Sequence, residues 1–315
     1  MQDATANRDL TVGAIDLGSN TFRLLIGGFT GDKPSVLLKR NITVGLGQGL
    51  SARGRLNGAA IGKGLAALRA FKAELDRYRP DCCRCCGTEA LRRADNAGVF
   101  LAEAAKILGV GIEVIDGAEE GFLSYRGVLA SLVGTAVEFP LLIIDVGAAS
   151  TELIYGAGDM RPPFSVSLPG GAGLFTELAS RGGRQEAFAL FTIGLKRFWA
   201  DCPPESEKIS VVATGGTATT MAMLDLGLDH YQPKKIEGHA LSGTAIARIY
   251  KELHALPIAT RKFLPGLEEG RSAIILAGIE IYQEILATIE VDGMIISDSG
   301  LLEGIMMSCL EAGLP

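Results

Sequence analysis

The sequence is poor in aromatic residues and has no excess of positive charge. Phe, Trp and Tyr make up 6% of the 315 residues, with a single Trp, so the chain offers no platform on which nucleic-acid bases would stack. Lys and Arg number 30 against 36 Asp and Glu, and the resulting charge of −6 argues against a long basic track. We therefore expect no nucleic-acid partner. A small phosphorylated ligand is still compatible with this negative net charge, because backbone dipoles can hold phosphate without a basic surface.

Long apolar runs are also missing. No stretch approaches the roughly 18–20 apolar residues of a membrane-spanning helix. The N-terminal MQDATANRDL is polar and lacks the apolar segment of a signal peptide. These two features predict a soluble, cytoplasmic protein without a membrane partner.

Zinc-binding residues are few. The three histidines show no ligand spacing, and four of the six cysteines are crowded into DCCRCC at 81–86. No second group of Cys or His completes a zinc site. We interpret this segment as a strand whose cysteines act as small apolar residues, with a metal or redox role as the weaker alternative.

Glycine is abundant, at 41 residues, and it marks a repeated phrase. LLIIDVGAASTELIYG at 141–156 echoes TVGAIDLGSNTFRLLIG at 11–27 without a gap when Asp16 is set against Asp145. A repeat separated by nearly half the chain indicates a duplicated domain rather than a solenoid.

Each copy of the phrase opens a similar succession of elements. Apolar periodicity predicts three strands joined by tight turns and then alternating helices and strands, in the order β-β-β-α-β-α. The sequence therefore predicts an α/β fold of two similar domains, 1–136 and 137–315, divided where GTAVEFP at 134–140 breaks the pattern. The last helix, about 299–315, is expected to pack back on the first domain. Paired domains of this kind commonly bind a ligand in a cleft.

Three glycine-rich turns follow predicted strands. Two are the D-x-G turns at Asp16 and Asp145, and the third is ATGGTATT at 213–220, which opens a helix. Backbone N–H groups in such turns hold phosphate oxygens, and an Asp beside the turn supplies the oxygen ligand that hydrated Mg²⁺ prefers. Any one of these turns is common, but the three together favour a phosphate site.

Six segments spread in order over nearly the whole chain resemble those of one family. The segments are AIDLGSNTFRLLI, GTEALRRADN, IEVIDGAEEGFLSYRGV, IIDVGAASTEL, ATGGTATTMAML and ISDSGLLEGIM. They are similar to the exopolyphosphatase / guanosine pentaphosphate phosphohydrolase family (Ppx/GppA), in its short two-domain form. The resemblance implies duplicated RNase H-like domains of the actin/hexokinase/acetate kinase superfamily, with mixed sheets flanked by helices and a cleft between the lobes. It also implies Mg²⁺-dependent removal of the terminal phosphate from inorganic polyphosphate or from guanosine pentaphosphate (pppGpp).

The resemblance assigns roles to single residues as well. Glu120 matches the catalytic base that orients and deprotonates the attacking water. Asp145 and Glu152 match the acids associated with Mg²⁺, for which Mn²⁺ is an alternative, and Asp16 would add a water-mediated contact. The expected phosphate-binding residues are Gly18, Ser19, Asn20, Arg92, Gly147, Ala148, Ser150, Thr151, Gly215, Gly216, Thr217 and Arg271.

Several of these assignments have an ordinary structural alternative. Glu119 and Glu120 would complement the dipole of a helix N-terminus simply as acids. Arg93 competes with its neighbour Arg92 as the phosphate ligand. Arg271 heads an apolar helix, where a structural ion pair would equally explain it.

The second D-x-G turn departs from the family pattern D-x-G-G-G-S-T-E, because Ala148 and Ala149 replace two glycines. If the turn requires a positive φ there, each alanine costs roughly 1 kcal/mol or more. If it does not, the two methyl groups would still crowd a bound phosphate.

Three functions therefore remain open: an exopolyphosphatase-type hydrolase, a weak or inactive phosphate-binding or nucleotide-binding regulatory member, and a small-molecule kinase of the same superfamily. The sequence does not choose between polyphosphate and pppGpp, and the resemblance is compatible with a homodimer.

Overall fold

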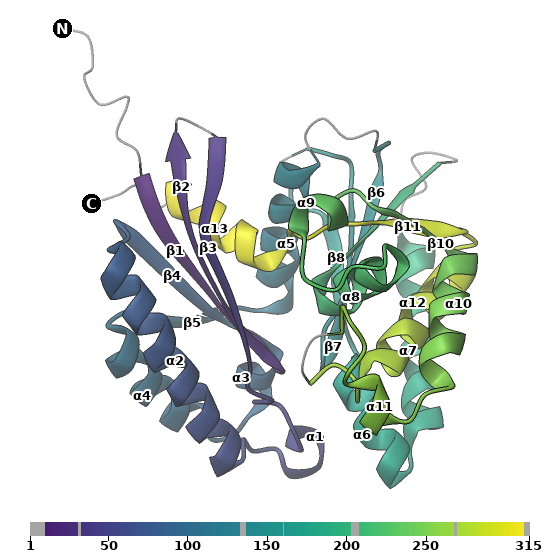
Figure 1. Cartoon of the computed structure of the whole chain (residues 1–315), viewed down its shortest axis with the longest axis horizontal. Coiled ribbons are helices and arrows are strands. Elements are labelled where there is room, and N and C mark those ends of the chain that lie inside the picture. Colours follow the sequence, from purple (N-terminus) through teal and green to yellow (C-terminus); the bar gives the residue numbers. More distant parts are fainter. Residues whose placement is uncertain are drawn as a thin grey trace, which may run out of the picture. The chain divides into compact units, whose positions relative to one another are not determined.

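The structure is a computed structural model of the chain, and it describes residues 10–30, 33–132, 137–159, 161–202, 208–267 and 270–311. Contacts between residues divide the chain into two units. The first runs to Asp116 and resumes at Leu301, and the second is Gly117–Gly300. Each unit is an α/β structure built on one mixed sheet (Figure 1). In the described part of the chain, no helix is both long and apolar enough to cross a membrane.

The first unit has a five-stranded sheet in the order β3-β2-β1-β4-β5. Strands β1, β2 and β3 form an antiparallel meander, and β4 and β5 continue the sheet parallel to β1. The strands are β1 (Leu10–Leu17), β2 (Thr21–Thr30), β3 (Lys33–Thr43), β4 (Cys82–Gly87) and β5 (Ile112–Val114). The helices are α1 (Leu50–Arg53), α2 (Gly58–Tyr78), α3 (Glu89–Arg93), α4 (Ala97–Leu108) and α13 (Leu301–Glu311).

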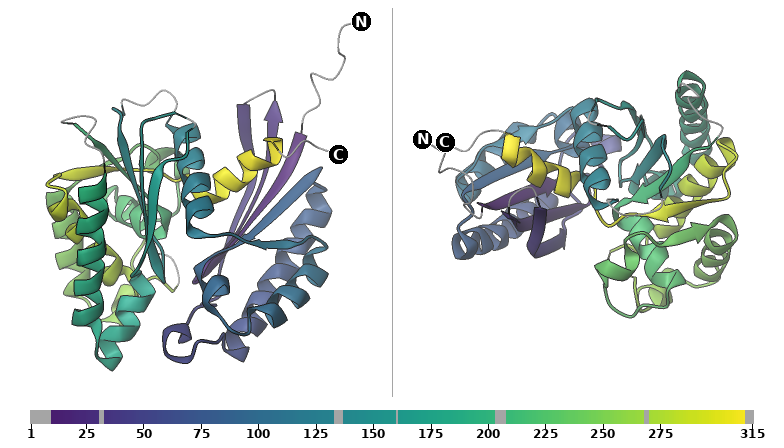
Figure 2. Two further views of the ribbon diagram at one scale, coloured as in Figure 1. Left: turned by 180° about the vertical axis from the view of Figure 1, so that it is seen from behind. Right: turned by 90° about the horizontal axis from the view of Figure 1, so that it is seen from above.

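Helices cover both faces of this first sheet. Asn57 caps α2 by accepting a hydrogen bond from the Ala60 N–H at 2.8 Å, and the predicted apolar face, centred on Leu68 and Phe71, is buried. Helices α2 and α4 lie on one face of the sheet and α13 on the other, as Figures 1 and 2 show. The two faces follow from the alternation of side chains along each strand.

The four clustered cysteines lie on β4, as the strand interpretation predicts. Cys85 and Cys86 are buried, and none of the four cysteines is in a disulfide. Burial raises the pKa of the Cys83 thiol to about 12 and that of the Cys85 thiol well above its usual range, so their reactive thiolates are scarce at neutral pH. The buried cysteines of β4 therefore serve as apolar packing residues.

The second unit has a six-stranded sheet in the order β10-β11-β9-β6-β7-β8. Strands β6, β9 and β11 are parallel, whereas β7, β8 and β10 pair antiparallel with their neighbours. The strands are β6 (Leu141–Val146), β7 (Ser150–Gly156), β8 (Phe164–Pro169), β9 (Ser210–Thr214), β10 (Ala240–Ser242) and β11 (Gly293–Ile296). The helices are α5 (Gly117–Ser131), α6 (Ala172–Arg181), α7 (Arg184–Asp201), α8 (Gly215–Asp225), α9 (Pro233–Ile236), α10 (Gly243–His254), α11 (Ile258–Arg261) and α12 (Ile275–Thr288).

The second sheet also carries a separate core on each face. On one face, Ile143 and Ile154 pack with Tyr125 of α5. On the other face, Leu142 and Ile144 pack with helices α6, α7, α8, α10 and α12. Neighbouring residues of β6 thus point to opposite cores, as the alternation of a buried strand requires.

The two units share one topology, which confirms the duplicated α/β fold. In each, an antiparallel meander of three strands is continued by parallel strands on the side of its first strand, giving β3-β2-β1-β4-β5 and β8-β7-β6-β9-β11. The repeated phrase is the hairpin that opens each unit, β1–β2 and β6–β7.

The division into units differs from the predicted boundary at 136. Helix α5 follows Asp116 and contacts β7 and β8, so it belongs to the second unit rather than the first. Helix α13 contacts β1, β2 and β4 of the first unit. Residues 134–136 of the segment expected to divide the domains lie outside the described residues.

Candidate active site

An acidic pair occupies the hairpin that opens the second unit. Asp145 at the end of β6 lies directly opposite Glu152 on β7. Glu152 is 4% exposed, and Ser167 of β8 donates a hydrogen bond to its Oε1 at 2.8 Å. Burial, and then the charges of Glu120 and Asp145, raise the pKa of Glu152 well above its usual range. Three carboxylates therefore share one region of this unit.

Glu120 reaches this region from the first turn of α5. Its side chain is buried, whereas that of its neighbour Glu119 is exposed to solvent. Helix α5 packs on β7 and β8, the strands that carry Glu152 and Ser167. Glu119 and Glu120 are the same residue type, and the structure distinguishes them by burial. It places Glu120 beside the acidic pair.

The corresponding hairpin of the first unit has a different charge pattern. Asp16 is buried, and its Oδ2 lies 3.8 Å from Nη1 of Arg23, the residue opposite it on β2. The register of the repeat sets Arg23 against Glu152. Asp16 therefore has a cationic neighbour, whereas Asp145 faces another acid. Sequence reasoning missed Arg23, although the aligned repeat contains the signal.

The turn after β6 has its carbonyl groups fixed by the segment that begins α6. The carbonyl oxygens of Gly147, Ala148 and Ala149 accept hydrogen bonds at 2.9, 2.8 and 3.2 Å. The donors are the N–H groups of Ala172, Leu174 and Gly170, respectively. In the described part of the chain, the N–H groups of Ala148 and Ala149 donate no hydrogen bond. These two donors suit an anion.

The two alanines of this turn do not require left-handed backbone. Among the described residues other than glycine, only Arg79 and Glu290 have positive φ, so Ala148 and Ala149 are unstrained in this respect. The segment that precedes α6 leaves room for the backbone of this turn, because its residue 171 is a glycine. A Cβ on Gly171 would lie 2.5 Å from the carbonyl carbon of Ala148. The strain considered for the alanines is therefore absent.

The hydroxyl groups next to this turn have partners within the unit. Thr151 is fully buried and donates to the Gly170 carbonyl at 2.6 Å, which ties β7 to the start of α6. Ser150 is buried on the same strand as Glu152, and its hydroxyl acts to lower the pKa of the Glu152 carboxyl. Both side chains thus shape the site from within, and their expected contacts with phosphate stay a prediction.

The first hairpin turn is fixed in the same way. The carbonyl of Ser19 accepts a hydrogen bond from Gly47, and that of Asn20 accepts from Val44 and Gly45, each at 2.8 Å. Both turns therefore direct their carbonyl groups toward the chain that follows the third strand of the meander. This shared design extends the duplication from the strands to the turns.

The third glycine-rich turn approaches Asp145. Gly215 has φ +82° and leads from β9 into α8, and a Cβ at this position would collide with Oδ1 of Asp145. A Cβ on Gly216 would collide with the guanidinium group of Arg271. Asp145 and Arg271 therefore pack against the Gly-Gly pair at the N-terminus of α8, which is a favourable place for an anion. Thr217, the next residue, is buried in α8.

A buried tyrosine joins the two strands that carry these groups. Tyr282 of α12 is fully buried, and its hydroxyl lies 2.9 Å from the Thr214 carbonyl and 3.4 Å from the Ile144 carbonyl. These carbonyls precede Gly215 and Asp145. Burial, and then the charge of Asp145, raise the pKa of Tyr282 well above its usual range, so the hydroxyl stays a donor. No sequence motif signals this residue.

Arg92 lies in the first unit and is engaged by its surroundings. Its guanidinium group donates to the Glu89 carboxylate at 2.9 Å and to the Ile115 carbonyl at 2.8 Å. Arg93 is more exposed, at 44% of its side chain, and its Nη1 lies 3.6 Å from Oε1 of the same Glu89. The role of Arg92 toward phosphate stays a prediction.

The predicted residues therefore form two sets, one in each unit. Gly18, Ser19, Asn20, Asp16 and Arg92 belong to the first unit, and all the others belong to the second. Within the described residues, no group of three or more His, Cys, Asp or Glu side chains is arranged to hold a metal ion. Mg²⁺ commonly takes one or two carboxylates and fills its remaining positions with water and phosphate oxygens.

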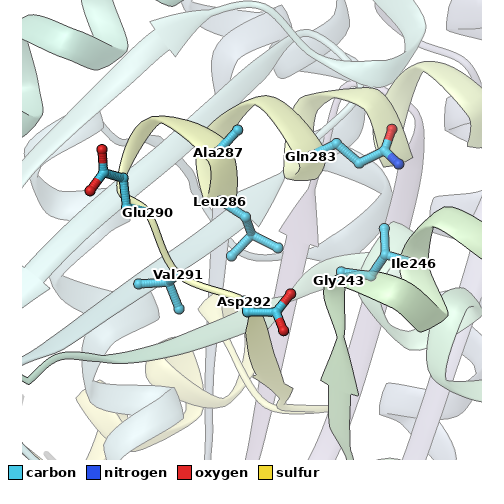
Figure 3. Close-up of a pocket in the computed structure, with 8 residues that line it drawn as sticks. All are labelled: Gly243, Ile246, Gln283, Leu286, Ala287, Glu290, Val291 and Asp292. Atoms are coloured by element: carbon cyan, nitrogen blue, oxygen red, sulfur yellow. The ribbon is translucent and has the colours of Figure 1, made fainter.

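A cavity of about 420 Å³ lies elsewhere in the second unit (Figure 3). Its lining comes from α10, α12 and the chain that enters β11, and it includes Leu286 and Asp292. The glycine-rich turns instead follow the carboxyl ends of β6 and β9, which run parallel to β11. The cavity therefore belongs to the opposite edge of the sheet, away from Asp145.

Comparison with known proteins gives consistent matches over the whole fold. The model of the Ppx/GppA phosphatase family matches residues 27–312. The crystal structure of the Aquifex aeolicus member of the Ppx/GppA family has a TM-score of 0.78 and 30% sequence identity, covering 97% of this chain and 99% of that chain. An exopolyphosphatase from Cytophaga hutchinsonii has a TM-score of 0.84 and 25% identity, covering 96% and 98% of the two chains.

Proposed function

Because the chain belongs to the Ppx/GppA phosphatase family, we propose that it is a Mg²⁺-dependent phosphohydrolase. Its substrate class is a terminal phosphoanhydride, as in inorganic polyphosphate or pppGpp. The observation that carries the proposal is the group formed by Glu120, Asp145 and Glu152 in the second unit.

The chemistry of these carboxylates fits a divalent cation. Glu152 is buried, and the charges of Glu120 and Asp145 both oppose its ionisation. Burying several like charges together is costly unless a cation compensates them. The aligned position in the first unit has Arg23 instead, which provides the compensation within the protein. Asp145 and Glu152 are therefore the residues that would hold Mg²⁺.

Each part of the site then has a role in hydrolysis. A Mg²⁺ ion held by Asp145 and Glu152 would neutralise charge on the phosphate oxygens. Glu120 orients the attacking water and accepts its proton at a carboxylate oxygen. Ser167 fixes the Glu152 carboxylate through the 2.8 Å hydrogen bond. The N–H groups of Ala148 and Ala149, with the N-terminus of α8, receive phosphate oxygens.

Phosphate release tests this proposal directly. The purified chain is incubated with short polyphosphate, long polyphosphate and pppGpp, with and without Mg²⁺. We expect release with at least one substrate, and we expect Glu120→Gln to lower the turnover rate by about 100-fold or more. The matched control is Glu119→Gln, because it removes the adjacent, exposed acid and should retain turnover. Equal activity of Glu120→Gln and wild type would contradict the mechanism.

Melting temperature tests the cation site independently of activity. A ligand that binds only the folded state raises the melting temperature, and the rise grows with the ratio of ligand concentration to Kd. We expect MgCl₂ to stabilise the wild type and to stabilise Glu152→Gln much less, because the variant has one carboxylate fewer. An equal shift in both proteins would place Mg²⁺ away from Glu152.

A further inference from the structure

Helix α7 exposes two large apolar side chains to solvent in addition to the apolar face that it buries. Phe191, Leu195 and Phe198 are buried in the core of the second unit. Leu190 and Ile193, one turn apart on the opposite face, are each 63% exposed. A helix at the surface of a protein normally has one apolar stripe. The second stripe of α7 therefore lacks a covering partner within the described residues of this chain.

Helix α10 of the same unit shows the usual pattern. It buries Ile246, Ile249 and Leu253, and its outer face carries Arg248 and Glu252, which pair with each other at 3.2 Å. The two exposed apolar residues of α7 thus contrast with the paired charges on the outer face of α10.

The exposed stripe of α7 has an acidic residue at one end and a basic residue at the other. Residues spaced by three or four positions form it, and all four are exposed: Glu186, Leu190, Ile193 and Arg197. The acid is four residues before Leu190, and the base is four residues after Ile193. In an antiparallel pair of such helices, Leu190 of one copy faces Ile193 of the other, and Glu186 faces Arg197. A single twofold axis that passes between residues 191 and 192 relates the two copies in both pairings.

We propose that this stripe is a self-association surface, on which two copies of the chain pair through antiparallel α7 helices related by a twofold axis. A closed twofold interface of this kind uses the same patch on both copies. The apolar pair supplies the buried area, and the two charge pairs fix the antiparallel direction. The proposal rests on the α7 surface alone and is independent of the proposed activity.

The size of the surface predicts a weak dimer. A single helix pair is smaller than the roughly 800 Å² per partner of a standard stable interface. Arg197 is also shared with Asp201, whose Oδ2 lies 4.0 Å from its Nε. We therefore expect a concentration-dependent equilibrium between monomer and dimer rather than a permanent dimer.

Sedimentation equilibrium of the full chain, from micromolar concentrations to about 1 mM, tests the proposal. We expect the wild type to form a reversible dimer and Leu190→Glu to remain monomeric. The matched control is Val99→Glu on α4, where an exposed apolar residue, 66% exposed, is replaced away from α7. This control should associate like the wild type. Far-ultraviolet circular dichroism and melting temperature verify that both variants fold.

A charge exchange tests the antiparallel register. Glu186→Arg and Arg197→Glu should each weaken dimerisation by about three- to tenfold, because each places like charges opposite each other. The double variant Glu186→Arg/Arg197→Glu should recover dimerisation to within about twofold of wild type. A monomeric wild type at all concentrations, a dimer that tolerates Leu190→Glu, or a double variant that stays weak would each overturn the proposal.

Discussion

At the scale of single residues, the two hairpins of the repeat differ most in charge. Arg23 and Glu152 occupy the same place in the two registers, opposite Asp16 and Asp145. With Arg23, the first hairpin contains both charges of an ion pair. With Glu152, the second hairpin places two carboxyl groups opposite each other, and that of Glu152 is buried. This one difference in a duplicated motif thus separates the hairpin of the proposed Mg²⁺ site from its counterpart in the first unit.

Tyr282 gives a test of positioning at this scale. Because its hydroxyl bonds the carbonyls that precede Asp145 and Gly215, its removal should loosen both without touching substrate. We expect Tyr282→Phe to lower the turnover rate by about tenfold with little change in KM, and to cost about 1 kcal/mol of stability. Phosphate-release kinetics and urea unfolding measure the two effects.

Tyr125 provides the matched control. It is also a fully buried tyrosine of the second unit, and its hydroxyl accepts a hydrogen bond from the Gly158 N–H at 2.8 Å, beyond the end of β7 opposite to the turn. Tyr125→Phe should cost similar stability but leave turnover unchanged. If both variants lose activity equally, the effect of Tyr282 is one of stability rather than position.

The sequence predicts single residues where they belong to a contiguous motif. Glu120, Asp145 and Glu152 each lie in such a segment, and the structure brings them into one region. Ser167 and Tyr282 were missed, because their roles depend on strand pairing and helix packing between segments distant in sequence. No local pattern encodes such a contact.

At the scale of elements, the turn after β6 depends on the segment that follows β8. The carbonyls of residues 147–149 are bonded by N–H groups of residues 170–174. The close approach at Gly171 makes this packing possible. The shape of the turn is therefore set by two chain segments together, and the composition of the turn alone does not determine it.

This coupling makes the turn tolerant of its alanines. Since neither Ala148 nor Ala149 has a positive φ, Ala148→Gly/Ala149→Gly relieves no strain. We expect less than about a threefold change in turnover, and a loss of about 1 kcal/mol or more in stability from the added freedom of the unfolded chain. Phosphate-release rates and urea unfolding are the measurements. A large gain in turnover would instead show that the two methyl groups obstruct the phosphate.

Elements with a clear period were predicted better than short ones. The sequence predicts helices over 184–200 and 242–254, and the structure has α7 and α10 there. In place of the helix predicted at 269–290, the structure has the shorter α12 at Ile275–Thr288, and residue 269 lies outside the described residues. Strand β10, of three residues, was missed, because so short an edge strand carries no measurable alternation and is defined by its pairing with β11.

At the scale of the whole molecule, the duplication was predictable and the boundary was not. The gapless repeat indicates two similar domains, and the shared strand order confirms them. The position of α5 depends on which sheet its apolar face covers, and that face packs on β7 and β8. Both sheets lie close to α5 in the sequence, so sequence order alone does not assign this helix.

The stability of the whole chain should depend on pH through a carboxyl group that is not a member of the acidic cluster. Glu237, which follows α9, accepts a hydrogen bond from the Asp298 N–H at 2.8 Å beyond the end of β11. Burial raises the pKa of Glu237 above its ordinary value. The contribution of such a group to stability is complete below its unfolded pKa, about 4.3, and is lost as pH rises through the folded pKa.

Glu237→Gln removes this dependence while the amide oxygen can still accept the Asp298 N–H. We therefore expect the free energy of unfolding of the variant, relative to wild type, to be higher at pH 8 than at pH 4, as measured by urea unfolding at both pH values. Glu103→Gln is the control, because Glu103 is an exposed partner of Lys106 and should give the same difference at both pH values. If Glu237→Gln also gives equal differences, ionisation of Glu237 does not oppose folding, and its carboxylate is as well accommodated in the folded chain as in water.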